Sequence, residues 1–275
     1  MRRNNENQID KWLSFRAGML KPDNWLPSLG GKRMHNRLFS QLLDRADTLG
    51  GADVISQIGW LSGCTPAFRK WVLKTLQWRL VQSGTGLSFA GDEDGGFFCL
   101  GQGQVTFQIG LGGTLATGYF GFPGSWWGQG PLLGVARLGS VTARTESVVG
   151  ILPMRALEAR LAEHPQDWAE IARGVADPLI NAAGAHADLL IESSRNRIAA
   201  TLLRLGSNRN RLFRVLVPRR FECTQDELAR ATGLSRNTAG FHLRALERAG
   251  LIRMGYGMIE LLDTQALTTI ADADC

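Results

Sequence analysis

Residues 224–247 read TQDELARATGLSRNTAGFHLRALE and contain the most informative pattern of the sequence. Thr224, followed three residues later by Glu227, forms a capping box, the pattern that begins a helix by satisfying its free backbone N–H groups. Gly233 supplies a tight turn after that helix, and Ser235 is a favoured residue for capping a second one. We therefore predict two helices that cross at a glycine turn.

The second of these helices carries polar side chains where a DNA-reading helix needs them. Its first turn presents Arg236 and Asn237, side chains whose forked hydrogen bonds suit base edges and phosphates. Residues 251–262 then read LIRMGYGMIELL, two β-prone runs around a glycine turn, which predicts a hairpin wing. The pattern as a whole predicts a winged helix-turn-helix. Its candidate DNA contacts are Thr224, Gln225, Ser235, Arg236, Asn237, Thr238, Phe241 and Arg244.

The positive charge of the chain is concentrated around this motif. The whole sequence carries a formal net charge of +6. Residues 193–275 contain 13 arginines, no lysine and 8 acidic residues, which leaves +5 on that segment. A basic segment favours a polyanionic partner, so we expect double-stranded DNA, although charge alone would also suit a merely solvated basic face.

The rest of the chain divides into segments that differ in their predicted secondary structure. Between Arg79 and Leu152, short β-prone runs alternate with glycine-rich turns, which predicts an antiparallel sandwich or jelly-roll barrel. Helical patterns lie at 35–49, from about Asp53 to Leu61, at 67–77 and at 154–163. We expect a partly flexible N-terminal extension at 1–52, an effector-type β-barrel domain with flanking helices at 53–164, a dimerisation helix at 165–192 and a winged helix-turn-helix DNA-binding domain at 193–275.

A long helical pattern begins at Pro165 and runs to about Leu190, and Pro178 should kink it or interrupt one hydrogen bond. One face has apolar and small residues at the three-and-four spacing of a helix-pairing seam. These residues are Trp168, Ile171, Val175, Leu179, Ala182, Ala183, His186, Leu189 and Leu190. We interpret the seam as a homodimer interface, the alternative being that it packs on the chain's own barrel.

The order of barrel, long helix and winged helix-turn-helix resembles the cyclic-AMP receptor protein/Fnr (Crp/Fnr) family. Residues 196–205 (NRIAATLLRL) look like the family's helix leading into its DNA-binding domain, and residues 233–240 (GLSRNTAG) look like its recognition helix. The resemblance implies an α+β fold with a cyclic-nucleotide-binding-like jelly-roll barrel, a long dimerisation helix and a C-terminal winged helix-turn-helix. It also implies a bacterial transcription regulator that binds a pseudo-palindromic operator as a homodimer, with RNA polymerase as a further partner.

Two positions depart from the family pattern in the recognition helix. Family members often carry glutamate where this chain has Asn237, and a second arginine where it has Phe241. Asparagine prefers adenine, and a phenylalanine ring suits the thymine methyl group. We therefore expect an operator different from the best-known one of the family.

The ligand residues of the family's barrel are only partly present. In the cyclic-AMP-binding members a glutamate holds the ribose and an Arg-Ser pair holds the phosphate, whereas here Gln129 and Leu138 replace the glutamate and the serine. Arg137 alone is kept, so we expect no cyclic nucleotide and leave open another small effector. The candidate ligand residues are Gln129, Arg137, Trp126 and Trp127. Alternatively, the aromatic group of Trp126, Trp127, Phe120 and Phe122 simply fills the barrel.

Other chemistries have little support in the sequence. The four cysteines show no C-x-x-C spacing, which argues against a zinc site, an iron–sulfur cluster or a disulfide framework, and only His186 is a candidate haem ligand. No nucleophile has a paired base, so an enzyme is not expected. The sequence shows no membrane-length apolar run and no secretory signal, so we expect a cytoplasmic protein without a membrane partner. The alternative function is a small-molecule sensor whose winged helix docks a protein and shows no DNA sequence preference.

Overall fold

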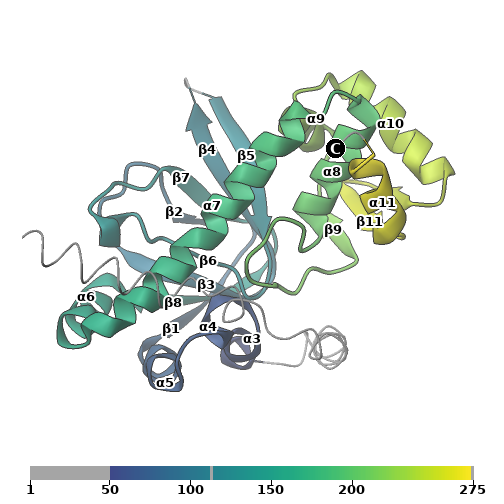
Figure 1. The fold of residues 1–275 in the computed structure, drawn as a ribbon. Helices are drawn as coiled ribbons and strands as arrows, with labels where there is room; N and C mark the ends of the chain where they lie inside the picture. Colours follow the sequence, from purple (N-terminus) through teal and green to yellow (C-terminus); the bar gives the residue numbers. More distant parts are fainter. Residues whose placement is uncertain (1–49, 112–113, 274–275) are drawn as a thin grey trace, which may run out of the picture. The chain divides into compact units, whose positions relative to one another are not determined.

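A computed structural model of the chain describes residues 50–111 and 114–273 (Figure 1). The helix expected at 35–49 and nearly all of the N-terminal extension lie outside these residues. The described chain opens with α3 (Gly51–Gln57), α4 (Gly59–Ser62) and α5 (Pro66–Thr75). The single helix predicted up to Leu61 is broken at Gly59, which has a φ of +73°. A Cβ at Gly59 would lie 2.1 Å from the Gly124 carbonyl oxygen, so only glycine fits there.

Two four-stranded antiparallel sheets follow, and they confirm the predicted sandwich. The strand orders are β1-β8-β3-β6 and β2-β7-β4-β5. The strands are β1 (Gln77–Val81), β2 (Gly86–Ser88), β3 (Gly96–Gln102), β4 (Val105–Leu111), β5 (Thr114–Gly121), β6 (Trp126–Trp127), β7 (Gly139–Ala143) and β8 (Ser147–Pro153). A short 3-10 turn, η3 (Pro131–Leu133), lies between β6 and β7.

Apolar side chains cover both faces of the sheet that contains β3 and β8. Between the sheets, Phe98 and Val149 pack with Val105, Phe107 and Val141 of the opposite sheet. On the other face, Phe97 and Leu152 pack with residues of α3 to α5, of α6 (Met154–Glu163) and of the long helix α7 (Trp168–Leu190). The alternation of side chains along each strand supplies both faces.

The long helix α7 (Trp168–Leu190) contains Pro178 and continues beyond it to Leu190. Pro165 opens a 3-10 turn, η4 (Pro165–Asp167), instead of the α-helix itself. Among the described residues, no helix is long and apolar enough to cross a membrane.

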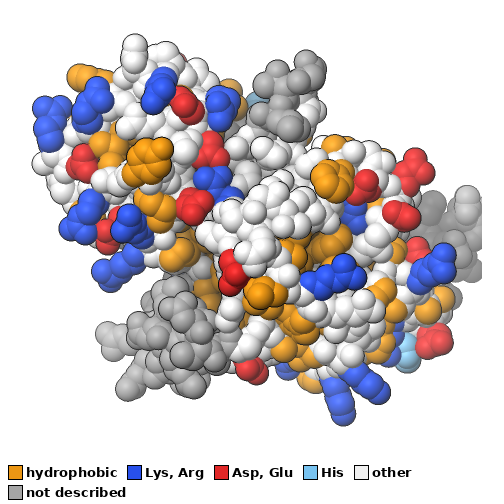
Figure 2. Space-filling model, turned by 180° about the vertical axis from the view of Figure 1, so that it is seen from behind, with side chains coloured by type: hydrophobic (Ala, Val, Ile, Leu, Met, Phe, Trp, Pro, Cys, Tyr) orange, Lys and Arg blue, Asp and Glu red, His pale blue; other side chains and the backbone are white. Residues whose placement is uncertain are grey.

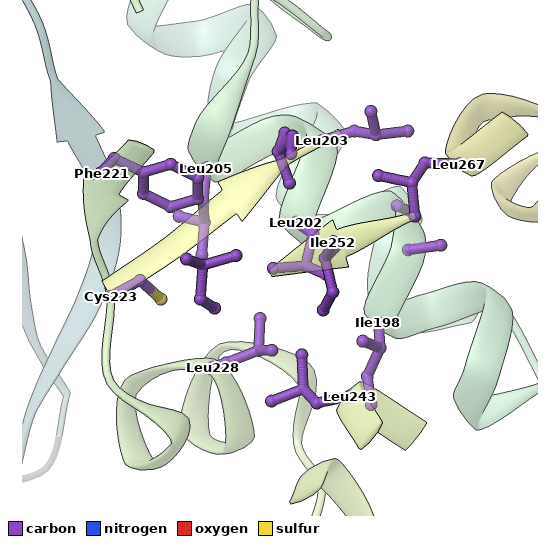
Figure 3. Close-up of a cluster of buried hydrophobic side chains, with 14 of the residues drawn as sticks. Ile198, Leu202, Leu203, Leu205, Phe221, Cys223, Leu228, Leu243, Ile252 and Leu267 are labelled. Carbon is purple, nitrogen blue, oxygen red and sulfur yellow. The ribbon is translucent and has the colours of Figure 1, made fainter. Parts of the chain in front are cut away.

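Residues 193–273, here called the C-terminal module, contain four helices and a three-stranded sheet. The helices are α8 (Ser194–Gly206), α9 (Gln225–Thr232), α10 (Arg236–Arg248) and α11 (Thr264–Ala271). The strands are β9 (Arg220–Glu222), β10 (Ile252–Gly255) and β11 (Met258–Leu261), in the order β10-β11-β9. Their buried side chains meet in one core, in which Leu202 of α8 and Ile252 of β10 are central (Figure 3). The predicted wing is confirmed, and β9 adds a third strand that the sequence did not reveal.

Two phenylalanines of the barrel lie in the core of the C-terminal module. Phe120 of β5 and Phe122 just after it are fully buried in the same cluster as Phe221, at ring-centroid distances of 6.3 Å in both cases. The expectation that these two rings fill the barrel or line a pocket inside it is therefore wrong. The physical reason is alternation: Tyr119 next to Phe120 stacks on Phe107 at 4.0 Å, so the following ring faces the opposite way.

Candidate nucleic-acid interface

Helix α9 begins with the capping box that the sequence predicts. The Thr224 hydroxyl accepts a hydrogen bond from the Glu227 N–H at 3.2 Å, and the Glu227 carboxylate accepts one from the Thr224 N–H at 2.9 Å. Burial alone would raise the pKa of Glu227, but hydrogen bonds from Arg144 and Thr224 outweigh it, so this pKa lies below its usual range. Glu227 is therefore an ionised carboxylate at the start of the helix.

The turn between the two helices also matches the prediction. Gly233 adopts the left-handed conformation with a φ of +64°, and the Leu234 N–H closes the turn on the Ala229 carbonyl at 3.0 Å. Ser235 caps α10 by accepting a hydrogen bond from the Thr238 N–H at 3.1 Å. The serine and threonine hydroxyls lie 2.8 Å apart. These local bonds hold the start of α10 in a defined orientation.

Helix α10 presents one buried and one exposed face. Ala239, Gly240, Leu243 and Leu246 are buried in the module. The exposed face carries predicted contact residues, namely Ser235, Arg236, Asn237, Phe241 and Arg244. The Arg236 side chain is 70% exposed and forms a surface ion pair with Asp226 at 3.4 Å, while Phe241 is 58% exposed. More than half of the Phe241 ring is therefore accessible to a partner on this face of α10.

Two predicted contact residues, Gln225 and Arg244, meet beside Gly240 where α9 and α10 cross. A Cβ at Gly240 would lie 3.3 Å from Gln225 Oε1 and 3.4 Å from Arg244 Nη1. Gln225 at the start of α9 and Arg244 in the middle of α10 therefore flank the same close approach. The structure thus places Gln225, at the amino end of α9, beside Arg244 of α10.

The wing adds candidate contacts that the sequence reading missed. Glu247 of α10 accepts a hydrogen bond from the Met254 N–H at 2.7 Å, which ties the wing to the recognition helix. At the tip, Tyr256 is fully exposed, and Arg253 beside it is paired with Glu260 at 2.9 Å. The sequence already pointed to Tyr256, because a ring between Gly255 and Gly257 at the tip of a hairpin has no core to pack against.

The arginines of the module fall into two groups. Arg204 is buried in an ion pair with Asp188 at 2.7 Å, and Arg197 donates to the Ile191 and Thr232 carbonyls. Many of the others are exposed, and Figure 2 shows arginine side chains spread over the surface of this part of the molecule. The charge excess is thus mainly a surface property, with a few arginines used to hold the module together.

The four predicted ligand residues of the barrel do not form one group. Trp126 packs outside the sandwich against Trp60 at 4.9 Å, whereas Trp127 lies inside it, stacked on Phe98 at 5.5 Å. Arg137 is buried over the same Phe98 ring, and its Nη2 donates to the Asp94 and Gly96 carbonyls at 2.9 Å. Burial lowers the pKa of Arg137. Gln129 is half-buried, and Leu138, where the serine would stand, is 83% exposed.

A small cavity of about 140 Å³ lies at the edge of the sandwich, between β1 and β2. Its walls are mostly apolar and include Phe98, but none of the four predicted ligand residues. It is lined by Arg79, Val81, Thr85, Gly86, Leu87, Phe98, Val149 and Ile151.

The predicted seam of α7 is divided between two faces. Ile171 is buried against the barrel helices and Val175 packs beside it. Leu179 and Leu190, at 68% and 70% exposure, point away, and His186 lies on the exposed side as well. Ile171 and Val175 of the predicted seam therefore pack on the same chain. In the later turns Asn181, Gly184 and Asp188 are buried, and the seam residues lie on the exposed side of the helix.

The described cysteines are unreactive thiols. Cys64, Cys99 and Cys223 are all free and buried. Burial raises the pKa of Cys64 and of Cys223 to about 12, and raises that of Cys99 as well. All three stay protonated at neutral pH, which suits packing and not redox or metal chemistry.

Comparison with known proteins adds the following similarities. A family model for the Crp-like helix-turn-helix domain matches residues 196–270. Transcriptional regulator SdrP of Thermus thermophilus is 30% identical over 154 residues, which cover 55% of this chain and 71% of the relative. Cyclic AMP receptor protein of the same organism is 30% identical over 212 residues, covering 76% of this chain and 94% of the relative. The crystal structure of a CRP-family transcriptional regulator, also from Thermus thermophilus, has a TM-score of 0.54 and 28% identity, over 70% of this chain and 96% of that chain.

Proposed function

Since this chain belongs to the Crp/Fnr family of transcriptional regulators, we propose that two copies bind one pseudo-palindromic operator and that each copy reads a half-site with α10. The observation that carries this proposal is the exposed start of α10, where Ser235 caps the helix and Arg236 and Asn237 face outward. Two modules related by a two-fold axis would read half-sites roughly 34 Å apart.

Each exposed side chain of the interface has a defined role in this proposal. Arg236 donates two hydrogen bonds to a guanine, Asn237 pairs with an adenine, and Phe241 contacts a thymine methyl group. The remaining polar residues hold the phosphate backbone. They are Thr224, Gln225, Ser235, Thr238 and Arg244. The same division between base readers and phosphate anchors is general for helix-turn-helix proteins.

The homodimer would form along the exposed part of α7. Leu179, Ala183, His186 and Leu190 follow one another at intervals of four, three and four residues, the spacing of a helix-pairing seam, and the two leucines are exposed in the single chain. Burying two exposed leucines per copy supplies apolar area for association. RNA polymerase is the expected protein partner at a promoter, on the strength of the family alone.

The barrel would take a small ligand with acceptor oxygens and not cyclic AMP. Nε and Nη1 of Arg137 and Nε1 of Trp127 are buried donors for which the described residues provide no acceptor. Buried donors need a partner, which a ligand oxygen would supply. The stacked rings of Phe107 and Tyr119 occupy the space between the sheets, which disfavours a purine there. Calorimetric titration with cyclic AMP should therefore give no binding heat.

Selection from a random duplex library by the purified protein, at fixed salt, tests the main proposal. The expected product is a palindromic motif. Arg236→Ala should then bind that motif with a loss of about 1–3 kcal/mol and should relax the preference at one base pair per half-site. The absence of any enriched motif would favour the protein-docking alternative, whereas unchanged affinity of Arg236→Ala would reject the role of this arginine.

A further inference from the structure

An arginine of the barrel binds the first helix of the helix-turn-helix. Arg144 lies in the turn between β7 and β8. Its Nη1 lies 2.5 Å from Oε1 of Glu227 and its Nη2 lies 3.2 Å from Oε2, so the pair is bidentate. The two side chains are only 15% and 13% exposed. Bidentate pairs shielded from water in this way are the strong and geometrically specific ones.

Neighbouring contacts fix the same orientation. The Gln104 side chain donates to the Glu222 carbonyl at 3.1 Å and accepts from the Glu222 N–H at 3.2 Å, as a strand partner would. The Arg144 guanidinium also lies over the Phe120 ring at 4.8 Å. Barrel and module therefore share hydrogen bonds and an ion pair in addition to a common apolar core.

Glu227 occupies a sensitive place for a DNA-binding helix. The amino end of a helix attracts phosphate through its free N–H groups and its dipole. The first turn of α9 carries two carboxylates, Glu227 and Asp226, and Asp226 has its own surface ion pair with Arg236. Next to the candidate phosphate anchors Thr224 and Gln225, the charge of Glu227 would likewise repel phosphate unless it were balanced. Arg144 provides that balance from the side of the barrel, and its Nε also lies 3.6 Å from Oε2 of Glu222, so that its positive charge is shared between two carboxylates.

We propose that Arg144 is a positioning residue for DNA binding, which neutralises Glu227 and holds the start of α9 in the orientation that fits the operator. This inference rests on the proposed function. Arg144 itself touches no DNA in it. The bridge makes the barrel a part of the binding unit, so that removal of Arg144 weakens binding even though every base-reading residue is intact.

The test compares full-length variants by fluorescence anisotropy on the motif selected by the wild type. Arg144→Gln should bind roughly tenfold more weakly. The salt dependence of its affinity should be unchanged, because no phosphate contact is lost. Arg144→Lys should recover part of the affinity, since it keeps the charge but not the fork. The matched control is Arg155→Gln, an exposed arginine of α6, which should bind as the wild type does.

A second pair of variants separates charge balance from a general packing defect. Glu227→Gln keeps a residue that serves in a capping box while removing the charge. If the proposal is correct, Arg144→Gln combined with Glu227→Gln binds more tightly than Arg144→Gln alone. The proposal would be overturned if the fold-losses in DNA affinity of the two single variants simply multiplied in the double variant. Equal binding by Arg144→Gln and the wild type would also overturn it, and so would tighter binding, which would mean that the bridge holds the module in an inactive state.

Hydrogen exchange keeps the inference testable if no motif is selected. That outcome would refute the proposed function, and the bridge would then be measured without DNA. Amides of residues 225–232 should exchange faster in Arg144→Gln than in Arg155→Gln. Equal exchange rates in the two variants would refute the positioning role by itself.

Discussion

Replacing Phe122 by alanine should destabilise the barrel and the C-terminal module together. The side chain is fully buried and meets Phe221 edge-on at 6.3 Å. Removing a buried phenylalanine costs about 3–5 kcal/mol through lost transfer energy and the cavity that remains. With a urea m-value of about 3 kcal/mol per molar, a loss of about 4 kcal/mol lowers the midpoint by about 1.3 M.

The chain offers separate probes for its two parts. All eight tryptophans lie before residue 169, so tryptophan fluorescence reports on the part of the chain that precedes the module and not on the module itself. Far-ultraviolet circular dichroism includes the helices of the module. Both midpoints should fall by the same amount in Phe122→Ala. Phe89→Ala, whose ring is 57% exposed, should change the free energy of unfolding by no more than about 0.5 kcal/mol and should shift neither midpoint appreciably. A fall in the fluorescence midpoint alone would refute a shared core.

Three further changes test other parts of the structure. Arg204→Met should lower the free energy of unfolding by about 3–5 kcal/mol because it leaves Asp188 as an unpaired buried charge, and urea unfolding should show a smaller loss when Asp188→Asn is added. Gly233→Ala should cost about 1–2 kcal/mol at its φ of +64°, seen as a lower Tm. The depressed pKa of Glu227 means that its stabilising effect is present above its usual pKa and is lost as the pH falls through the lower folded value. When the pH is lowered from about 6 to roughly 3, the free energy of unfolding measured in urea should therefore fall less for Glu227→Gln than for the wild type.

The features that the sequence predicted correctly are local ones. The capping box joins Thr224 to Glu227, and the cap of α10 joins Ser235 to Thr238, each within three residues. Gly233 takes the left-handed conformation that its position in the turn required. Such patterns are readable because the interacting groups are neighbours in the chain, so residue type and spacing alone specify the geometry.

The contacts between barrel and module could not be predicted in this way. Arg144 and Glu227 are 83 residues apart in the chain, and Gln104 and Glu222 are 118 apart. An arginine after a strand and a glutamate in a capping box each have an adequate local explanation. Nothing in the spacing indicates that they pair, because that depends on how two separately patterned units pack.

Strand β5 packs against both the core of the barrel and the core of the C-terminal module. It belongs to an antiparallel sheet, in which one face commonly packs on the core and the other face is left to water. Here Tyr119 faces inward on Phe107, while Phe120 and Phe122 face outward into the core that contains Phe221. A strand buried on both faces cannot shift toward one core without opening a gap in the other, because protein interiors are close-packed. A change in the barrel that moved Tyr119 would therefore also move the neighbouring Phe120, which packs in the core of the module and under the Arg144 guanidinium. Such a change would reach α9 without contacting α10.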